Sequence, residues 1–145
     1  MASPRAYFDT SALVKRYVRE EGSVRVRGLL RRRGVLSAAI ITVELASALS
    51  RRRSEGDLSS QDFAAIESRV REDRAYWHLI ELSPLVLVRA EELVQKSNLR
   101  TLDAVHVAAA LVFQEASGAR VPFVTGDSRL AEATRAFGLE VIQVG

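Results

Sequence analysis

RAYFDTSALV, residues 5–14, places a short apolar run, an acid and the start of a helical pattern directly one after another. Residues 6–8 are typical of a buried strand that ends in Asp9. Thr10 and Ser11 then offer side-chain oxygens that can cap the helix that follows. Because catalytic groups gather at the carboxyl ends of parallel strands, Asp9 is a candidate catalytic acid. Asp is also a favoured cap and turn residue, so a structural role stays open.

Strand patterns and helix patterns alternate along the rest of the chain. Further strands are expected at 35–37, 78–82, 121–125 and 140–144. Further helices are expected at 24–33, 40–53, 61–76, 85–97, 102–117 and 129–137, with Thr101 as the cap of the helix at 102–117. Strands that are separated by helices predict a parallel sheet covered on both faces, which is an α/β fold.

The composition is that of one compact domain over residues 1–145. A chain of 145 residues with 48% hydrophobic content can bury one core but not two ordinary ones. Cysteine is absent, which excludes disulfides and thiolate chemistry and suits a reducing compartment. The opening MASPR contains no signal-peptide core, and the longest apolar run, 104–113, is too short to span a bilayer. We therefore expect a cytoplasmic protein with no membrane partner.

Arginine carries almost all of the positive charge, and the net charge is +3. Two runs, at 31–33 and 51–53, consist of three arginines each. Arginine is suited to bidentate phosphate contacts, but cations are also favourable at helix C-termini. The runs are therefore first interpreted as solvated helix ends, and charge alone does not establish an RNA partner.

Three further acids occupy positions that suit a functional site. Glu44 lies early in the helix at 40–53 among apolar neighbours, so we expect it to be partly buried and to meet a cation, a donor or a metal ion. Asp103 falls in the first turn of its helix, where the helix dipole also favours an acid. Asp127 follows the strand at 121–125 and can equally cap the next helix.

Taken together, these acids point to a metal site. Asp9 and Asp127 follow two parallel strands, while Glu44 and Asp103 begin helices at the same edge of the sheet, so we expect all four carboxylates to converge. Two carboxylates about 4 Å apart repel by roughly 4 kcal/mol at an effective dielectric near 20, so protons or cations must compensate them. An all-oxygen ligand set suits Mg²⁺, or else Mn²⁺, and such a site can activate water against a phosphodiester.

Several polar residues beside the acids are candidates for contacts to substrate or to the carboxylates. They are Thr10, Ser11, Thr125, Ser128 and His106. Helix capping explains the hydroxyl groups equally well, and packing inside the fold explains His106. His78 is assigned a structural role.

Four short segments match the motifs of a known family. DTSAL at 9–13, TVEL at 42–45, LDAVHVA at 102–108 and TGDSRL at 125–130 resemble, in order and spacing, the motifs of the PIN-domain nucleases. Within that family the chain is similar to the VapC-type toxins of toxin-antitoxin pairs. The resemblance covers almost the whole chain.

This resemblance implies a three-layer α/β/α sandwich around a parallel sheet of four to five strands. It also implies Mg²⁺-dependent cleavage of RNA that leaves a 5′-phosphate, with Asp9, Glu44, Asp103 and Asp127 as the catalytic and metal-binding acids. The expected partners are the RNA substrate, a second copy in a homodimer and a small VapB-type antitoxin. Operator DNA is expected to bind only through the toxin-antitoxin complex.

Other functions fit the sequence less well. A haloacid-dehalogenase-type phosphotransferase needs a second Asp two residues after the first, where this chain has Ser11, and a receiver domain needs a late lysine, but none follows Lys96. A metal-independent ribonuclease would have only His78 and His106 for acid-base work. A PIN-like module that binds metal or peptide without catalysis remains an alternative.

Overall fold

The computed structural model describes residues 4–145, so the first three residues of the N-terminal segment lie outside it. Its centre is one five-stranded sheet in the order β3-β2-β1-β4-β5, and every neighbouring pair is parallel. The strands are β1 (Arg5–Phe8), β2 (Gly34–Ala38), β3 (His78–Ile80), β4 (Phe123–Thr125) and β5 (Val141–Gln143). The expected parallel α/β sheet is confirmed.

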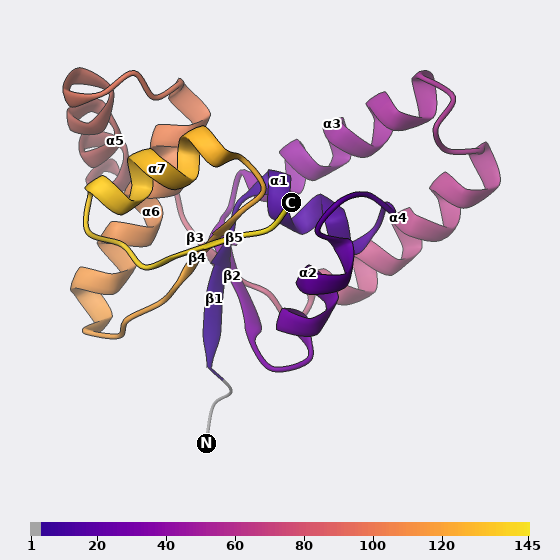
Figure 1. Ribbon diagram of the computed structural model, residues 1–145, viewed down its shortest axis with the longest axis horizontal. Helices are drawn as coiled ribbons and strands as arrows, with labels where there is room; N and C mark the ends of the chain where they lie inside the picture. The colour runs from indigo at the N-terminus through magenta and orange to yellow at the C-terminus, as the bar shows by residue number, and fades with distance from the viewer. Residues whose placement is uncertain (1–3) are drawn as a thin grey trace.

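Helices cover both faces of this sheet (Figure 1). One face carries α1 (Thr10–Leu13), the 3-10 turn η1 (Val14–Arg16), α2 (Ser23–Leu30), α3 (Ile41–Ser54) and α4 (Ser60–Arg74). The other face carries α5 (Pro84–Lys96), α6 (Thr101–Ser117) and α7 (Ser128–Ala136). The result is the three-layer α/β/α sandwich expected from the sequence.

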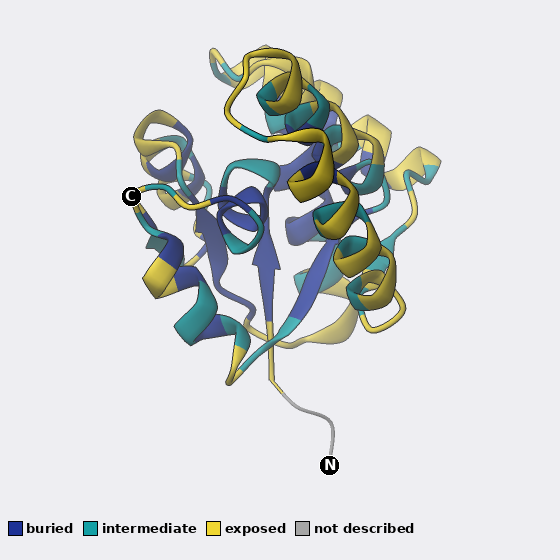
Figure 2. Cartoon of the chain, turned by 90° about the vertical axis from the view of Figure 1, so that its right-hand side faces the viewer, coloured by how far each residue is buried: buried dark blue, intermediate teal, exposed yellow. Residues whose placement is uncertain are grey.

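Side-chain alternation along β1 divides the core between the two faces. Ala6 and Phe8 pack with the helices that precede β3, whereas Tyr7 packs with α5 and α6. Eight consecutive residues of α6, from Ala104 to Leu111, are buried, and its small alanines allow the helix to lie close to the sheet. Figure 2 shows the buried strands at the centre and the exposed outer sides of the helices.

The strand order creates a topological switch beside β1. The chain leaves β1 toward β2 and β3, and later returns to the opposite side of β1 as β4. In open parallel sheets, ligands bind at such a switch, outside the carboxyl ends of the strands. Asp9 follows β1 and Asp127 follows β4, so the fold places both acids at this point.

The structure corrects several local expectations. Asp9, rather than Thr10 or Ser11, caps α1: its side chain accepts from the Ala12 N–H, and α1 ends after one turn, continued by η1. Thr101 is the first residue of α6 and not its cap, because the extended residue before the helix is Arg100, which makes no side-chain cap bond. The later strands are also shorter than predicted, because pairing ends within three residues.

Among residues 4–145, no helix is long and apolar enough to cross a membrane.

Candidate active site

Asp9 is the centre of a buried hydrogen-bond network between the ends of β1 and β4. One carboxylate oxygen accepts from Ser11 Oγ at 2.7 Å and from the Ala12 N–H at 2.9 Å, and the other accepts from Thr125 Oγ1 at 2.5 Å. Ser11 Oγ also accepts from the Gly126 N–H at 2.8 Å. The network fixes the loop between β4 and α7 against the start of α1.

Burial makes the charge on Asp9 expensive. The residue is only 3% exposed, and burial raises its pKa, while the hydrogen bonds from Thr125 and Ser11 and the nearby His106 lower it and offset part of that rise. No cationic side chain within residues 4–145 forms an ion pair with Asp9. Hydrogen-bond donors and the nearby His106 therefore offset only part of the cost of ionising the buried Asp9 carboxyl group.

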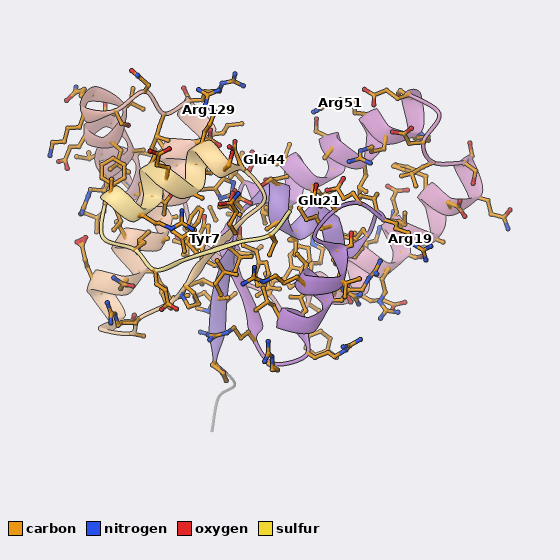
Figure 3. The ribbon with its side chains drawn as sticks, viewed as in Figure 1. Tyr7, Arg19, Glu21, Glu44, Arg51 and Arg129 are labelled. Atoms are coloured by element: carbon orange, nitrogen blue, oxygen red, sulfur yellow. The ribbon has the colours of Figure 1, made fainter. Side chains whose placement is uncertain are left out.

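Glu44 belongs to a second network, which reaches from α3 through α6 to β1. Glu44 Oε1 lies 2.6 Å from His106 Nε2, and His106 Nδ1 lies 2.7 Å from the Tyr7 hydroxyl. The Tyr7 oxygen in turn accepts from the Ala38 N–H at 3.1 Å. Glu44 is partly buried, as expected, and its side chain is 17% exposed. Figure 3 shows Glu44 at the carboxyl edge of the sheet, between Arg129 and Arg51.

His106 links the Tyr7 hydroxyl to the Glu44 carboxylate. Burial raises the pKa of Tyr7 well above its usual value, so the hydroxyl keeps its proton while it shares a hydrogen bond with His106 Nδ1. Because an ionised carboxylate can only accept, the Nε2–H of His106 donates to Glu44. Burial raises the pKa of Glu44, but the hydrogen bond and charge of His106 outweigh it, so the net pKa is lowered.

Sequence reasoning missed Tyr7. Its aromatic ring in an apolar strand reads as ordinary core, and it stacks on Phe123 as a core residue would, with ring centroids 5.0 Å apart. The only signal in the sequence was that a buried tyrosine hydroxyl needs a hydrogen-bond partner, which the imidazole of His106 is able to supply. Only the packing of α6 on β1 shows that the two meet.

Asp103 and Asp127 face the same open pocket, whose volume is about 540 Å³. Arg100 and Arg129 also line it, but neither forms an ion pair with these acids within residues 4–145. Burial raises the pKa of Asp103, and repulsion from Asp127 and, to a smaller degree, Glu44 raises it further. Three of the four predicted acids thus act on one another electrostatically.

Asp127 has the capping role that the sequence left open. Its Oδ1 accepts from the N–H groups of Arg129 and Leu130 at 2.9 and 3.2 Å, and the residue is exposed. The other carboxylate oxygen forms no hydrogen bond within residues 4–145 and can bind another partner. A cap and a functional acid are therefore compatible at this position.

The hydroxyl residues differ in their surroundings. Ser11 and Thr125 contact Asp9 directly, whereas Ser128 is exposed at the start of α7. The Thr10 hydroxyl oxygen is buried and has no partner in hydrogen-bond geometry within residues 4–145, although the side chain lies near enough to Glu44 to contribute to its lowered pKa. His78 packs edge-on against Phe113, which agrees with a structural role.

The chemistry of these residues fits a hard divalent cation. The acids supply only oxygen ligands, and burial and repulsion from Asp127 raise the pKa of Asp103, an effect that the nearby His106 and Arg100 offset only in part. However, no three His, Asp or Glu side chains among residues 4–145 are arranged to hold one metal ion together. The convergence of Asp9 and Glu44 with Asp103 and Asp127 on a single ion therefore stays a prediction.

A family comparison agrees with this arrangement. The model of the PIN domain matches residues 6–136, which include all four acids. The chain belongs to the PIN domain family. No curated protein matches the sequence significantly.

Several solved structures align with nearly the whole of this PIN-domain chain. A toxin-antitoxin complex from Klebsiella pneumoniae has a TM-score of 0.64 at 18% identity, covering 95% of this chain and 96% of its own. VapBC2 from Rickettsia felis, bound to a DNA fragment from its promoter, has a TM-score of 0.67 at 13% identity, covering 97% and 98%. A protein from Pyrobaculum aerophilum has a TM-score of 0.59 at 21% identity, covering 95% and 83%. At these identities the likeness shows the fold.

The burial of Asp103 and its repulsion by Asp127 predict a substitution that stabilises the fold. Because the pKa of Asp103 is raised in the folded state, ionisation favours the unfolded chain, and this penalty appears as the pH rises above the ordinary value of 3.8. Without metal, Asp103→Asn is expected to increase the free energy of unfolding at pH 7, and the difference should shrink toward pH 3. Urea unfolding in EDTA measures it, with Asp57→Asn in the exposed turn after α3 as control. A variant less stable than wild type at pH 7 would contradict it.

The Tyr7 hydroxyl predicts a second effect on stability. Tyr7→Phe leaves the Ala38 N–H and His106 Nδ1 buried without their partner, so we expect a loss of about 1–3 kcal/mol in the free energy of unfolding. The control Tyr76→Phe, at a position that is 88% exposed, should leave the free energy of unfolding unchanged. Thermal or urea unfolding gives both values, and equal stability of Tyr7→Phe and wild type would refute the proposed hydrogen bonds.

Proposed function

We propose that this PIN domain is a metal-dependent endoribonuclease that acts as the toxin of a toxin-antitoxin pair. The family match over residues 6–136 supports the proposal, because that range includes the four acids that the sequence motifs single out. PIN domains are generally nucleases and generally use divalent metal ions. Mg²⁺ is the proposed cofactor, with Mn²⁺ as the second candidate.

The four acids differ in their exposure and in their hydrogen-bond partners, and the proposal gives them different roles accordingly. Asp9, Glu44, Asp103 and Asp127 are the proposed metal-binding and catalytic residues. Asp103 and Asp127 face the open pocket, where a phosphodiester can enter. Asp9 and Glu44 are held in place, Asp9 by Ser11 and Thr125 and Glu44 by His106. A bound divalent ion would supply Lewis-acid polarisation of the phosphate and lower the pKa of water.

His106 and the hydroxyl residues serve as positioning groups in this proposal. His106 orients the Glu44 carboxylate through the proton that it donates from Nε2. Thr125 and Ser11 fix the rotamer of Asp9. Ser128, which is exposed at the start of α7, is proposed to contact the substrate, and Thr10, whose buried hydroxyl lies near Glu44, is proposed to support that carboxylate.

The partner proposals have separate support. Two structural neighbours are toxin-antitoxin complexes, and one of them contains promoter DNA. We infer that a small VapB-type antitoxin binds this chain and that operator DNA is contacted through the complex. A homodimer is proposed from the family resemblance. A short reading frame encoding a basic-tailed protein directly upstream of the gene would support the antitoxin.

Loss of RNA cleavage in selected variants tests the enzyme proposal. Purified protein without antitoxin should cut RNA in Mg²⁺ and leave it intact in EDTA. Asp103→Asn should reduce the cleavage rate at least about 100-fold, because even partners of metal ligands contribute 10- to 100-fold. Gel analysis of a labelled single-stranded RNA measures the rate, and Asp57→Asn should cut like wild type.

The same assay separates the alternatives. Full activity in EDTA would indicate a metal-independent ribonuclease. If the folded protein binds Mn²⁺ but cuts no RNA under any condition, it is a non-catalytic PIN-like module. Circular dichroism of each variant shows that lost activity is not lost fold.

A further inference from the structure

A second pocket lies at the edge of the sheet opposite to the acids. Its volume is about 410 Å³, within the range of pockets that bind small ligands. It is formed where α2 ends, where β2 begins at Gly34, and where α4 ends. Figure 1 shows the loop between α2 and β2 at this opposite edge, far from the junction of β4 and α7. The pocket is therefore separate from the candidate active site.

Arginines dominate the charge of this pocket. Arg27, Arg31 and Arg33 line it, and no carboxylate lies within 4.0 Å of any of the three among residues 4–145. By contrast, Arg52 and Arg89 elsewhere on the surface are paired with glutamates. A cluster of unpaired guanidinium groups is expected to attract an anion, and phosphate matches the fork of donors on each group.

The single acid of the pocket does not neutralise these arginines. Asp73 accepts a hydrogen bond from the Tyr17 hydroxyl at 2.6 Å. It also lies 3.6 Å from Arg16 Nε and 3.4 Å from Arg69 Nε. Its charge is therefore compensated by its own neighbours. Within residues 4–145 the three remaining arginines have no carboxylate partner, and Arg33 Nη1 donates only to the Arg5 carbonyl, at 3.5 Å.

An exposed aromatic ring adjoins the arginines. Tyr76 is 88% exposed, and Trp77 beside it is partly buried in the pocket wall. The turn that carries them is held by backbone bonds from Tyr76 N–H to Asp73 and from Trp77 N–H to Arg74. An exposed aromatic ring beside free guanidinium groups is the arrangement on which unpaired bases stack.

The helix dipole explains only part of this pattern. Arg27 lies in the last turn of α2 and Arg31 caps it, and cations are favourable there. The dipole does not explain Arg33, which lies beyond the helix, or the exposed Tyr76. The solvated-end interpretation of the run at 31–33 is therefore incomplete.

We propose, building on the ribonuclease function proposed above, that this pocket is a second contact for single-stranded RNA. Arg27, Arg31 and Arg33 bind backbone phosphates, and an unpaired base stacks on Tyr76. The pocket would hold the strand at one edge of the sheet while the acids act at the other. The predicted ligand is a single-stranded polynucleotide rather than a duplex, because only unstacked bases reach the tyrosine ring.

Binding measured without cleavage tests the proposal. All variants are made in the Asp103→Asn background and titrated in EDTA against a fluorescent single-stranded RNA of about 12 nucleotides, followed by anisotropy. The pair Arg31→Gln with Arg33→Gln should weaken binding about tenfold. It should also reduce the slope of log affinity against log salt by about 1.4, or 0.7 for each lost phosphate contact.

Matched control variants distinguish binding at this pocket from nonspecific attraction of RNA to positive charge. The pair Arg120→Gln with Arg135→Gln removes the same charge from exposed positions outside the pocket and should have a much smaller effect. Tyr76→Ala should weaken binding at least about fivefold with no change in salt slope, and Tyr76→Phe should bind like the parent protein. Equal affinity of the pocket pair and the control pair would overturn the proposal.

Two further ligands distinguish other occupants. If duplex DNA of the same length binds as tightly and ignores Tyr76→Ala, the pocket contacts backbone alone and the single-strand assignment is wrong. If polyglutamate displaces the RNA at equal charge, the occupant is an acidic protein segment and the proposal is again wrong. Pocket-dependent binding without any cleavage by the wild-type protein would refute only the ribonuclease proposal, and cleavage with pocket-independent binding would refute only the second contact.

Discussion

The structure depends on the burial of a carboxyl group inside the fold at the junction of β1 and β4. Asp9 is almost completely buried, and its side chain accepts hydrogen bonds from two hydroxyl groups and one backbone N–H. These donors come from the segments on either side of the topological switch, so the cost of burying Asp9 is met only when β4 and α1 are correctly placed.

The candidate site combines fixed and freer acids. Asp9 and Glu44 are each held through partners that lie inside the fold, and the second of these networks reaches the sheet through Tyr7. Asp103 and Asp127 instead face the open pocket, where they repel each other. This arrangement suits a metal site in which the buried acids are held in a fixed geometry and the exposed acids complete the set of ligands when a cation and substrate bind.

The sequence predicted the parallel sheet, and it predicted that Asp9 and Asp127 follow strands, because both features depend on local patterns. A strand that ends at an acid puts Asp9 and Asp127 at the carboxyl edge without knowledge of packing. The contact between His106 and Tyr7 was not predictable in this way, because it depends on the angle at which α6 crosses β1. The cap of α1 was expected at Thr10 and Ser11, with a cap role of Asp9 left open, because local propensity does not rank these three residues. The structure shows Asp9 as the cap. The arginine run at 31–33 was visible, but its neighbour Tyr76 is far away in sequence.

Direct measurement of divalent-ion binding tests the central claim most sharply. Calorimetric titration of the wild-type protein with Mn²⁺ and with Mg²⁺ should show saturable binding, and Asp103→Asn should weaken it at least about tenfold. Asp57→Asn should bind as wild type does. Absence of saturable binding by the folded wild-type protein, or equal affinity in Asp103→Asn, would contradict the claim that these acids form a metal site.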